Sequence, residues 1–296
     1  MTASPAVSPA QIHAAAEALN RLRPVYKDLL GFYEKIFVAQ EASKAHIDLA
    51  PPCISPELRD VKRREKLPLR DVSDFTFDPR AARDLLIQIC GIIRADNPEM
   101  AAAAAAIVSA LDKELQPDIL FASLLKSDDD YFVKMAAALT CDKNALAFVA
   151  YNSLKPSVTT GAEQLSHYLT ELDQWEKGYC PVCGNYPGLA VLDYDGRRFL
   201  QCSFCWTAWP AKRVFCPFCE KTGGNRYHSL FSAQEKDLRA DVCDICHKYL
   251  KTVDTRAADR IIYPALEQIA SLHLDITARQ KGYDSGMEMV LPDAVD

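Results

Sequence analysis

Apolar residues at three- and four-residue spacing run through most of the first 175 positions and predict amphipathic helices. One helix should begin at Ser8-Pro9, where a capping side chain precedes a proline in the first turn. We therefore expect a mainly helical domain of about eight helices. After the helix at Ser8, they are predicted at Pro24–Ala42, within the proline-rich loop Ala50–Val72, from Asp78, from Asn97 to Leu111, and at Pro117–Lys126, Asp129–Leu139, Asp142–Leu154 and Gly161–Leu172.

The pattern changes at Trp175, where cysteine, glycine, proline and aromatic residues replace alanine and leucine. Two short runs, Leu189–Leu192 and Arg197–Gln201, alternate around Asp195-Gly196, a pair typical of tight hairpin turns. Tyr227–Phe231 and Leu238–Val242 predict a second hairpin of the same kind.

Helical periodicity returns near Ala257 and continues to about Gln280. The chain is therefore divided into an α-helical domain (1–175), a small β-containing lobe (176–253), and a C-terminal helix and tail (254–296) that close the fold.

Composition and charge narrow the classes of function. The chain has 34 Lys and Arg against 40 Asp and Glu, a formal net charge of −6, which gives no electrostatic reason to bind nucleic acid or an anionic membrane. The longest uncharged apolar stretch, Met100–Leu111, falls well short of the roughly 20 residues that cross a bilayer. No basic lead and apolar block of a secretory signal occurs before Arg23. We expect a cytoplasmic protein without membrane insertion, and the oligomeric state stays open.

Four Cys-x-x-Cys pairs carry the main chemical signal. Eight of the 11 cysteines lie between Cys180 and Cys246, and in a reducing compartment such pairs indicate metal ligands or redox groups more than disulfides. Two residues between cysteines let a tight turn direct both sulfurs at one ion, and two turns complete a tetrahedral site. The predicted ligands are Cys180, Cys183, Cys202, Cys205, Cys216, Cys219, Cys243 and Cys246.

The predicted hairpins favour sequential pairing of these turns. Folding the first hairpin brings Cys183 and Cys202 together, so the first two pairs should form one site and the last two pairs the other. An interleaved arrangement, with the first pair joined to the third, stays open. The expected lobe thus holds two modules of the rubredoxin or zinc-ribbon kind.

Four protein thiolates suit zinc and rubredoxin-type iron alike, so the donor set does not choose the metal. A site closed by four protein ligands offers no position to substrate or water, and no other catalytic constellation is visible, so we do not expect an enzyme. A structural role for the metals and an electron-transfer role for iron both stay open. Four cations near the pairs in sequence are expected to offset the thiolate charge: Arg197, Arg198, Lys212 and Arg213.

Other reactive residues have simpler interpretations. Cys90 and Cys141 lie in apolar helical contexts and are expected in the core, whereas Cys53 lies in a loop. His247 directly follows Cys246 and is interpreted as a bystander. The basic run at 62–64 is expected on a solvated helix face.

The cysteine segment resembles a known family, the accessory (maturation) proteins of respiratory formate dehydrogenases, or FdhE family. The likeness covers about Cys180 to Lys251 and includes residues between and beside the cysteines. One departure is Ala208, where an acidic residue is expected before the tryptophan. The matching stretches are Cys180-Pro-Val-Cys183-Gly184, Leu200-Gln-Cys202-Ser-Phe-Cys205, Trp209 and Arg213 ahead of Cys216-Pro-Phe-Cys219, and Cys243-Asp-Ile-Cys246-His-Lys-Tyr249-Leu-Lys251.

This resemblance implies a cytoplasmic assembly factor that binds the catalytic subunit of formate dehydrogenase and is not itself an enzyme. It also implies iron bound in a rubredoxin-like manner by the eight cysteines. Two alternatives stay open: a small redox protein serving the dehydrogenase, and a zinc-ribbon module that binds nucleic acid. The acidic net charge of −6 weighs against the second alternative.

Overall fold

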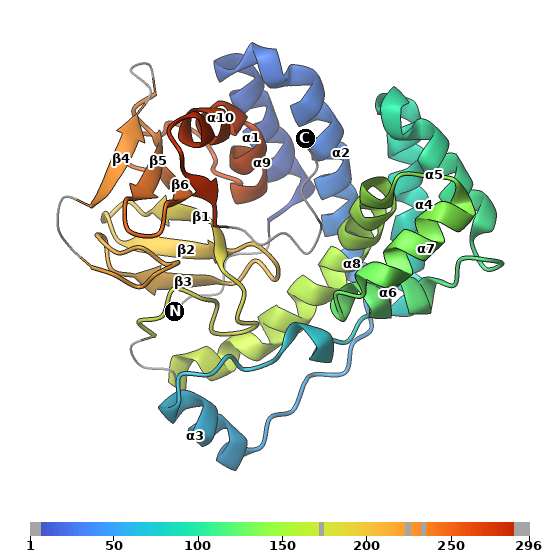
Figure 1. Cartoon of the computed structure of the whole chain (residues 1–296), viewed down its shortest axis with the longest axis horizontal. Coiled ribbons are helices and arrows are strands. Elements are labelled where there is room, and N and C mark those ends of the chain that lie inside the picture. The colour runs from blue at the N-terminus through green and yellow to red at the C-terminus, as the bar shows by residue number, and fades with distance from the viewer. Residues whose placement is uncertain (1–6, 172–174, 223–225, 232–234, 287–296) are drawn as a thin grey trace.

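The computed structural model describes residues 7–171, 175–222, 226–231 and 235–286. Figure 1 shows a helical region (blue to green) beside one β-sheet (yellow to orange), with the last two helices (red) against the sheet. This is the predicted fold class: a mainly helical N-terminal region, a small lobe with two cysteine modules, and a helical closure. In the described part of the chain, no helix has the length and apolarity needed to cross a bilayer.

The helical region is organised around one long central helix, α8. This helix contacts five others, α2, α4, α5, α6 and α7, and most of its side chains are buried. Short 3-10 turns occur at Pro24–Tyr26, Lys44–His46, Val72–Asp74 and Ser166–Glu171. The α-helices are α1 (Pro9–Leu22), α2 (Lys27–Ser43), α3 (Pro56–Arg64), α4 (Pro79–Asp96), α5 (Pro98–Ala110), α6 (Pro117–Leu125), α7 (Asp129–Leu139) and α8 (Lys143–Leu165).

The predicted helix starts are confirmed by their caps. Ser8 Oγ accepts from Gln11 N at 3.3 Å, and Asp78 Oδ1 accepts from the backbone N–H of Ala81 at 3.0 Å. Each cap precedes a proline, whose missing N–H costs nothing in the first turn. Cap and proline together therefore fix where these helices begin.

The prediction of two separate helices at 142–154 and 161–172 is wrong, because α8 continues through Pro156. A proline inside a helix leaves the carbonyl four residues earlier without its usual donor. Here that carbonyl belongs to Asn152, and Gln40 Nε2 of α2 donates to it at 2.8 Å. A side chain from a neighbouring helix thus replaces the lost hydrogen bond.

The two predicted hairpins join into one seven-stranded sheet within the described residues, in the order β3-β2-β1-β6-β5-β4, with β7 added beside β6. The neighbours β3-β2-β1 and β6-β5-β4 are antiparallel, whereas β1 and β6 run parallel where the halves meet, and β7 also pairs with β6 in parallel. The strands are β1 (Pro187–Leu192), β2 (Arg198–Cys202), β3 (Ala208–Ala211), β4 (Tyr227–Phe231), β5 (Leu238–Cys243), β6 (Lys248–Asp254) and β7 (Asp284–Ser285).

The C-terminal closure consists of two helices, where the sequence predicted one. They are α9 (Pro264–Ile269) and α10 (Leu272–Gln280), and α10 packs Leu274 and Ala278 against the sheet. Ser271 Oγ, at the break, donates to the Glu267 carbonyl at 2.6 Å. The chain can therefore turn there without leaving this buried backbone group unpaired.

One hydrophobic core crosses from the helices into the lobe. Val182, Phe204 and Trp209 of the lobe belong to the same buried cluster as Ile36 and Leu154 of the helices. The first cysteine module is therefore packed directly against the helical region.

Candidate metal centres

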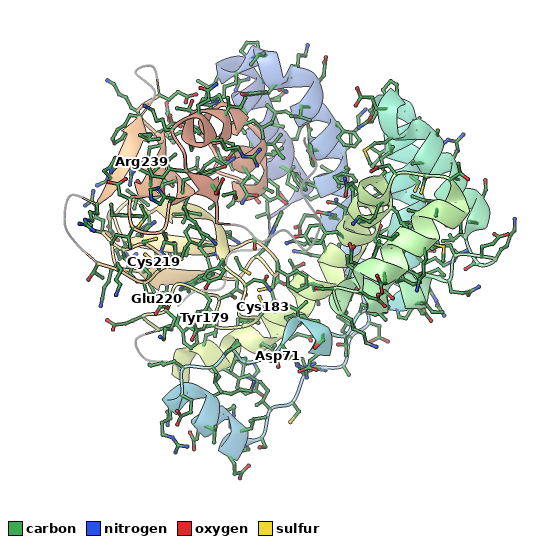
Figure 2. The ribbon with its side chains drawn as sticks, in the orientation of Figure 1. Asp71, Tyr179, Cys183, Cys219, Glu220 and Arg239 are labelled. Carbon is green, nitrogen blue, oxygen red and sulfur yellow. The ribbon has the colours of Figure 1, made fainter. Side chains whose placement is uncertain are left out.

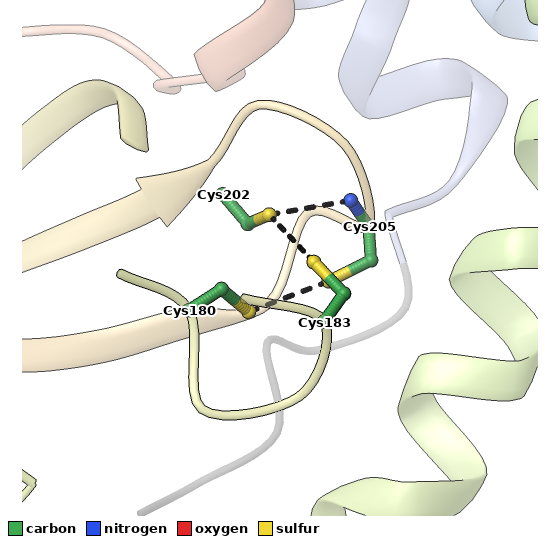
Figure 3. Close-up of side chains that lie close together, drawn as sticks. All are labelled: Cys180, Cys183, Cys202 and Cys205. Atoms are coloured by element: carbon green, nitrogen blue, oxygen red, sulfur yellow. Dashed lines mark hydrogen bonds between the residues drawn. The ribbon is translucent and has the colours of Figure 1, made fainter. Parts of the chain in front are cut away.

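The first cluster lies where two turns meet beside the helical region. Cys180 and Cys183 precede β1, while Cys202 ends β2 and Cys205 lies in the turn that follows. Figure 3 shows the four side chains converging, with Sγ–Sγ separations of 3.6 Å between Cys180 and Cys205 and 3.4 Å between Cys183 and Cys202. We name this cluster site 1.

The sulfur positions of site 1 fit a tetrahedral ion. A metal about 2.3 Å from each thiolate would place the sulfurs about 3.8 Å apart. All four sulfurs lie within 4.8 Å of one another, and all four cysteines are buried. The geometry can hold one ion without moving the backbone.

Backbone amides support the sulfurs of site 1. Val182 N lies 3.4 Å from Cys180 Sγ, and Phe204 N lies 3.4 Å from Cys202 Sγ. Such N–H donors offset negative charge on thiolates, so the same tight turns that direct the sulfurs also stabilise them.

The second cluster, site 2, repeats the arrangement on the outer side of the lobe. Sγ–Sγ separations are 3.6 Å between Cys216 and Cys246 and 3.7 Å between Cys219 and Cys243. Cys216 and Cys243 are buried, but Cys219 and Cys246 are half-buried. Figure 2 shows Cys219 toward the outside of the lobe and Cys183 of site 1 toward the helices.

The structure thus brings the cysteines together in the sequential arrangement. Cys180 and Cys183 join the second pair, and the third pair joins the fourth. No pair is shared between sites 1 and 2, so each hairpin forms one module.

We call each Cys-x-x-Cys turn a knuckle. In every knuckle the residue after the second cysteine has a left-handed backbone conformation. The residues that follow the four Cys-x-x-Cys pairs are Gly184, Trp206, Glu220 and His247, with φ of 77°, 61°, 57° and 54°. This conformation costs a non-glycine residue about 1–2 kcal/mol. The strain at Trp206, Glu220 and His247 is therefore a shared requirement of the turn that aims two sulfurs at one point.

Two of these strained residues use their side chains to tie the lobe together. Glu220 Oε1 accepts from the backbone N–H of Gly178 at 3.0 Å. The His247 ring stacks on Tyr283, with ring centroids 6.2 Å apart and planes at 28°. His247 lies outside both four-cysteine groups, which agrees with its interpretation as a bystander.

Burial disfavours the ionised form of the clustered cysteines unless an opposite charge compensates it. It raises the pKa of the Cys180, Cys183 and Cys216 thiols well above their usual range and that of Cys246 to about 11. Burial opposes ionisation of Cys205 too, but hydrogen bonds from the other thiols of site 1 hold the pKa of Cys205 well below its usual range. One thiol can ionise alone, whereas four thiolates need a bound cation.

Both sites lie in segments that match domain models of one family. The family model described as "FdhE, central domain" matches residues 179–213, and "FdhE, C-terminal domain" matches residues 214–291. Residues 179–291 thus match two FdhE family models. The boundary between the two matched domains falls between Cys205 and Cys216, so the central domain contains site 1 and the C-terminal domain contains site 2.

Curated relatives carry the same family name. An FdhE homolog from Aquifex aeolicus is 33% identical over 142 residues, which cover 47% of this chain and 49% of that protein. The FdhE protein of Escherichia coli K12 is 37% identical over 111 residues, 36% of this chain and 35% of that protein. The chain thus aligns with half or less of the length of these relatives.

A solved FdhE structure has a similar fold. The crystal structure of the FdhE protein from Pseudomonas aeruginosa matches with a TM-score of 0.63 over 96% of each chain, at 20% sequence identity. At this identity the match shows that the two chains share a fold.

Three of the four cations expected to offset the thiolate charge have carboxylate partners of their own. Arg197 pairs with Asp193, and Lys212 pairs with Glu176. Arg198 is buried, and its Nη1 donates to the Phe215 carbonyl at 2.7 Å; its carboxylate partner is Asp241.

Sequence reasoning missed Lys155, a buried cation beside site 1. It lies in α8, far from the cysteines in sequence, and is 4% exposed. Burial lowers its pKa to about 7, while the thiolates of Cys202, Cys205 and Cys183 act in the opposite direction. The buried residues around it on α8 include the polar Asn152 and Thr159, so no apolar stripe marked Lys155 in the sequence.

The remaining cysteines lie apart from the clusters. Cys53 is exposed, Cys90 is fully buried among the helices, and Cys141 is half-buried against the same core. Burial raises the pKa of Cys90 to about 12. The basic run at 62–64 forms the last turn of α3, a helix with no buried residue.

Proposed function

We propose that this chain is a cytoplasmic assembly factor that binds the catalytic subunit of a respiratory formate dehydrogenase and catalyses no reaction itself. The match of residues 179–291 to FdhE family models supports the accessory role. The observation that carries the proposal is the position of the match, since residues 179–291 include both four-cysteine clusters.

The eight clustered cysteines are proposed as the ligands of two metal ions, one in each site. Their sulfur separations suit a tetrahedral ion, and the donor set fits iron and zinc alike. The family resemblance favours rubredoxin-like iron. Four protein ligands leave no open coordination position, which supports a non-catalytic role.

The three-part division at 175 and 253 is part of the same proposal. The helical region and the lobe would act as one rigid body, because a single buried cluster joins them. Limited proteolysis followed by mass determination of the fragments tests these boundaries.

Anaerobic co-purification tests the partner. Tagged chain and the formate dehydrogenase catalytic subunit are co-expressed, and the retained complex is measured by size exclusion with light scattering. We expect a stable complex with the metal-loaded chain and its Cys53→Ser control, because Cys53 is exposed and outside both clusters. A metal-loaded chain that retains no catalytic subunit would refute the assembly role.

Electron transfer through site 2 is the second candidate. The half-buried positions of Cys219 and Cys246 favour it, because a donor or acceptor could approach this metal more closely than the buried site 1. This role requires iron, so a colourless purified protein containing only zinc excludes it. A zinc-ribbon role on nucleic acid would instead show salt-dependent binding to single strands.

A further inference from the structure

A lysine from the helical region lies against the second turn of site 1. Lys155 Nζ donates to the backbone carbonyl of Ser203 at 3.3 Å and also to that of Phe204. It donates to Tyr151 Oη at 2.9 Å, and that hydroxyl in turn donates to the Ser203 carbonyl at 2.9 Å. One turn of α8 therefore holds the peptide between Cys202 and Cys205.

Lys155 has no carboxylate partner within ion-pair distance among the residues that the structure describes. Carbonyl and hydroxyl oxygens satisfy its N–H groups but do not neutralise its charge. An ammonium that is 4% exposed needs an opposite charge nearby, because burying an unpaired charge is very unfavourable. The peptide that Lys155 contacts lies between two cysteines of site 1, Cys202 and Cys205, so the charge of a metal-loaded site 1 would lie beside it.

Trp206 provides independent support for this contact. Its indole ring lies 4.6 Å from Lys155 Nζ, in the geometry of a cation–π interaction. The same ring packs edge-on to Phe37 of α2 at 6.0 Å and to Tyr263 at 5.8 Å. Trp206 also has a left-handed backbone, with φ of 61°. Its ring contacts therefore connect a strained residue of site 1 to the helices.

The two sites differ in how their charge can be compensated. Site 2 has half-buried sulfurs at Cys219 and Cys246, where solvent can screen the charge. Site 1 is buried throughout. A four-thiolate site carries −2 with a divalent metal, and in a buried location this charge must be balanced by protein groups.

We propose that Lys155 is the counter-charge of site 1 and that it couples metal occupancy at this site to docking of α8 on the lobe. This inference rests on the proposed metal binding by the eight cysteines. With metal bound, the anionic cluster and the ammonium stabilise each other across the interface. When the metal leaves, this mutual stabilisation is lost and α8 loosens from the turn.

Metal-release kinetics test the coupling. Metal-loaded protein is mixed with excess chelator, and the release of each ion is followed in wild type, Lys155→Met and Lys155→Arg. We expect Lys155→Met to release one of the two ions about 10- to 100-fold faster, the usual range for loss of a group supporting a metal site. The other ion should leave at the wild-type rate, and Lys155→Arg, which keeps the charge, should restore most of the retention.

Lys251→Met is the matched control. Lys251 is also buried, but it pairs with Asp275 at 2.6 Å. We expect this variant to leave the release rate of the site 1 ion unchanged. Release of both ions from Lys155→Met at wild-type rates overturns the proposal, as does a Lys251→Met variant that accelerates the same ion equally.

Hydrogen exchange of the wild-type chain provides a measurement that does not depend on how the variants fold. Removing the metals should reduce protection of the backbone around Lys155 in α8, as well as at the site 1 turns. Unchanged protection in α8 overturns the coupling. A purified chain that binds no metal at all would instead refute the proposed ligand role of the cysteines.

Discussion

A side-chain carbon added to Gly178 would lie 1.7 Å from the carbonyl oxygen of Pro217. Gly178 lies two residues before Cys180 of the first Cys-x-x-Cys pair, and Pro217 lies inside the third pair. The backbone N–H of Gly178 also donates to Glu220 at 3.0 Å. The two metal modules are therefore in backbone contact, and only glycine fits at this point.

Gly178→Ala should consequently destabilise the lobe. The added methyl group forces the backbone apart, and overpacking of this kind costs about 1–3 kcal/mol. Denaturant unfolding of the metal-loaded protein measures the loss. Gly31→Ala in α2 is the control, because a side-chain carbon at that position meets nothing within 4 Å. This substitution should not destabilise the protein, since alanine restricts the unfolded chain more than glycine does. Equal stabilities of Gly178→Ala and Gly31→Ala would contradict this account of the contact.

Arg198 joins the two halves of the sheet. It lies on β2, is 2% exposed, and donates to Tyr227 Oη of β4 at 2.7 Å. Removing a buried cation of this kind costs about 3–5 kcal/mol, so Arg198→Met should lower the free energy of unfolding by that amount. Chemical denaturation measures this difference from the wild type.

Arg197 is the neighbouring control. It pairs with Asp193, but its side chain is 68% exposed, so Arg197→Met should cost only about 0–1 kcal/mol. If the Arg197 and Arg198 variants lost similar stability, the buried cross-sheet contact would not be the cause.

Local signals in the sequence predicted much of this fold. Capping residues followed by proline at Ser8 and Asp78 gave correct helix starts, since these signals act within one turn. The Cys-x-x-Cys spacing and the Asp195-Gly196 turn likewise predicted which pairs meet.

Features that depend on distant contacts were not predicted. Helix α8 crosses Pro156 only because Gln40 of another helix donates to the freed carbonyl. The strand β6 is buried along most of its length and so lacks the alternation that marks a half-exposed strand. Lys155 meets site 1 through tertiary packing, and no spacing rule connects residues 48 positions apart.

His13 should titrate above its ordinary pKa. A hydrogen bond to Glu34 at 2.6 Å raises the pKa of His13 above 6.5, because the carboxylate favours the protonated ring. The raised pKa means that the stabilisation of the α1–α2 contact is fully present below about pH 6.5 and is lost as pH rises through the folded-state value. NMR titration of the His13 ring measures this shift.

Glu34→Gln should return the His13 pKa toward 6.5. Glu17→Gln is the matched control, since Glu17 lies farther from the ring, at 3.4 Å, and should have a smaller effect. If the pKa of His13 were the same in Glu34→Gln as in the wild type, a group other than Glu34 would cause the shift.

The cysteines should fall into three classes of reactivity. In the metal-loaded protein, Cys53 should react first with a maleimide because it is exposed, and Cys90 should stay unmodified because it is fully buried and its pKa is raised to about 12. The clustered cysteines should become reactive only after chelation. Peptide mass spectrometry locates each adduct, and rapid labelling of Cys180 or Cys202 before chelation would contradict metal ligation at site 1.

Metal content of two quadruple variants, measured after anaerobic purification together with the absorption spectrum, tests the central claim most directly. Wild type should carry two ions per chain. Replacing all four cysteines of site 1 by serine should leave one ion, because site 2 keeps its ligands. Replacing Cys180, Cys183, Cys216 and Cys219 by serine removes half of each site and should leave none. One ion in this last variant and none in the first would contradict two independent sites built from sequential pairs.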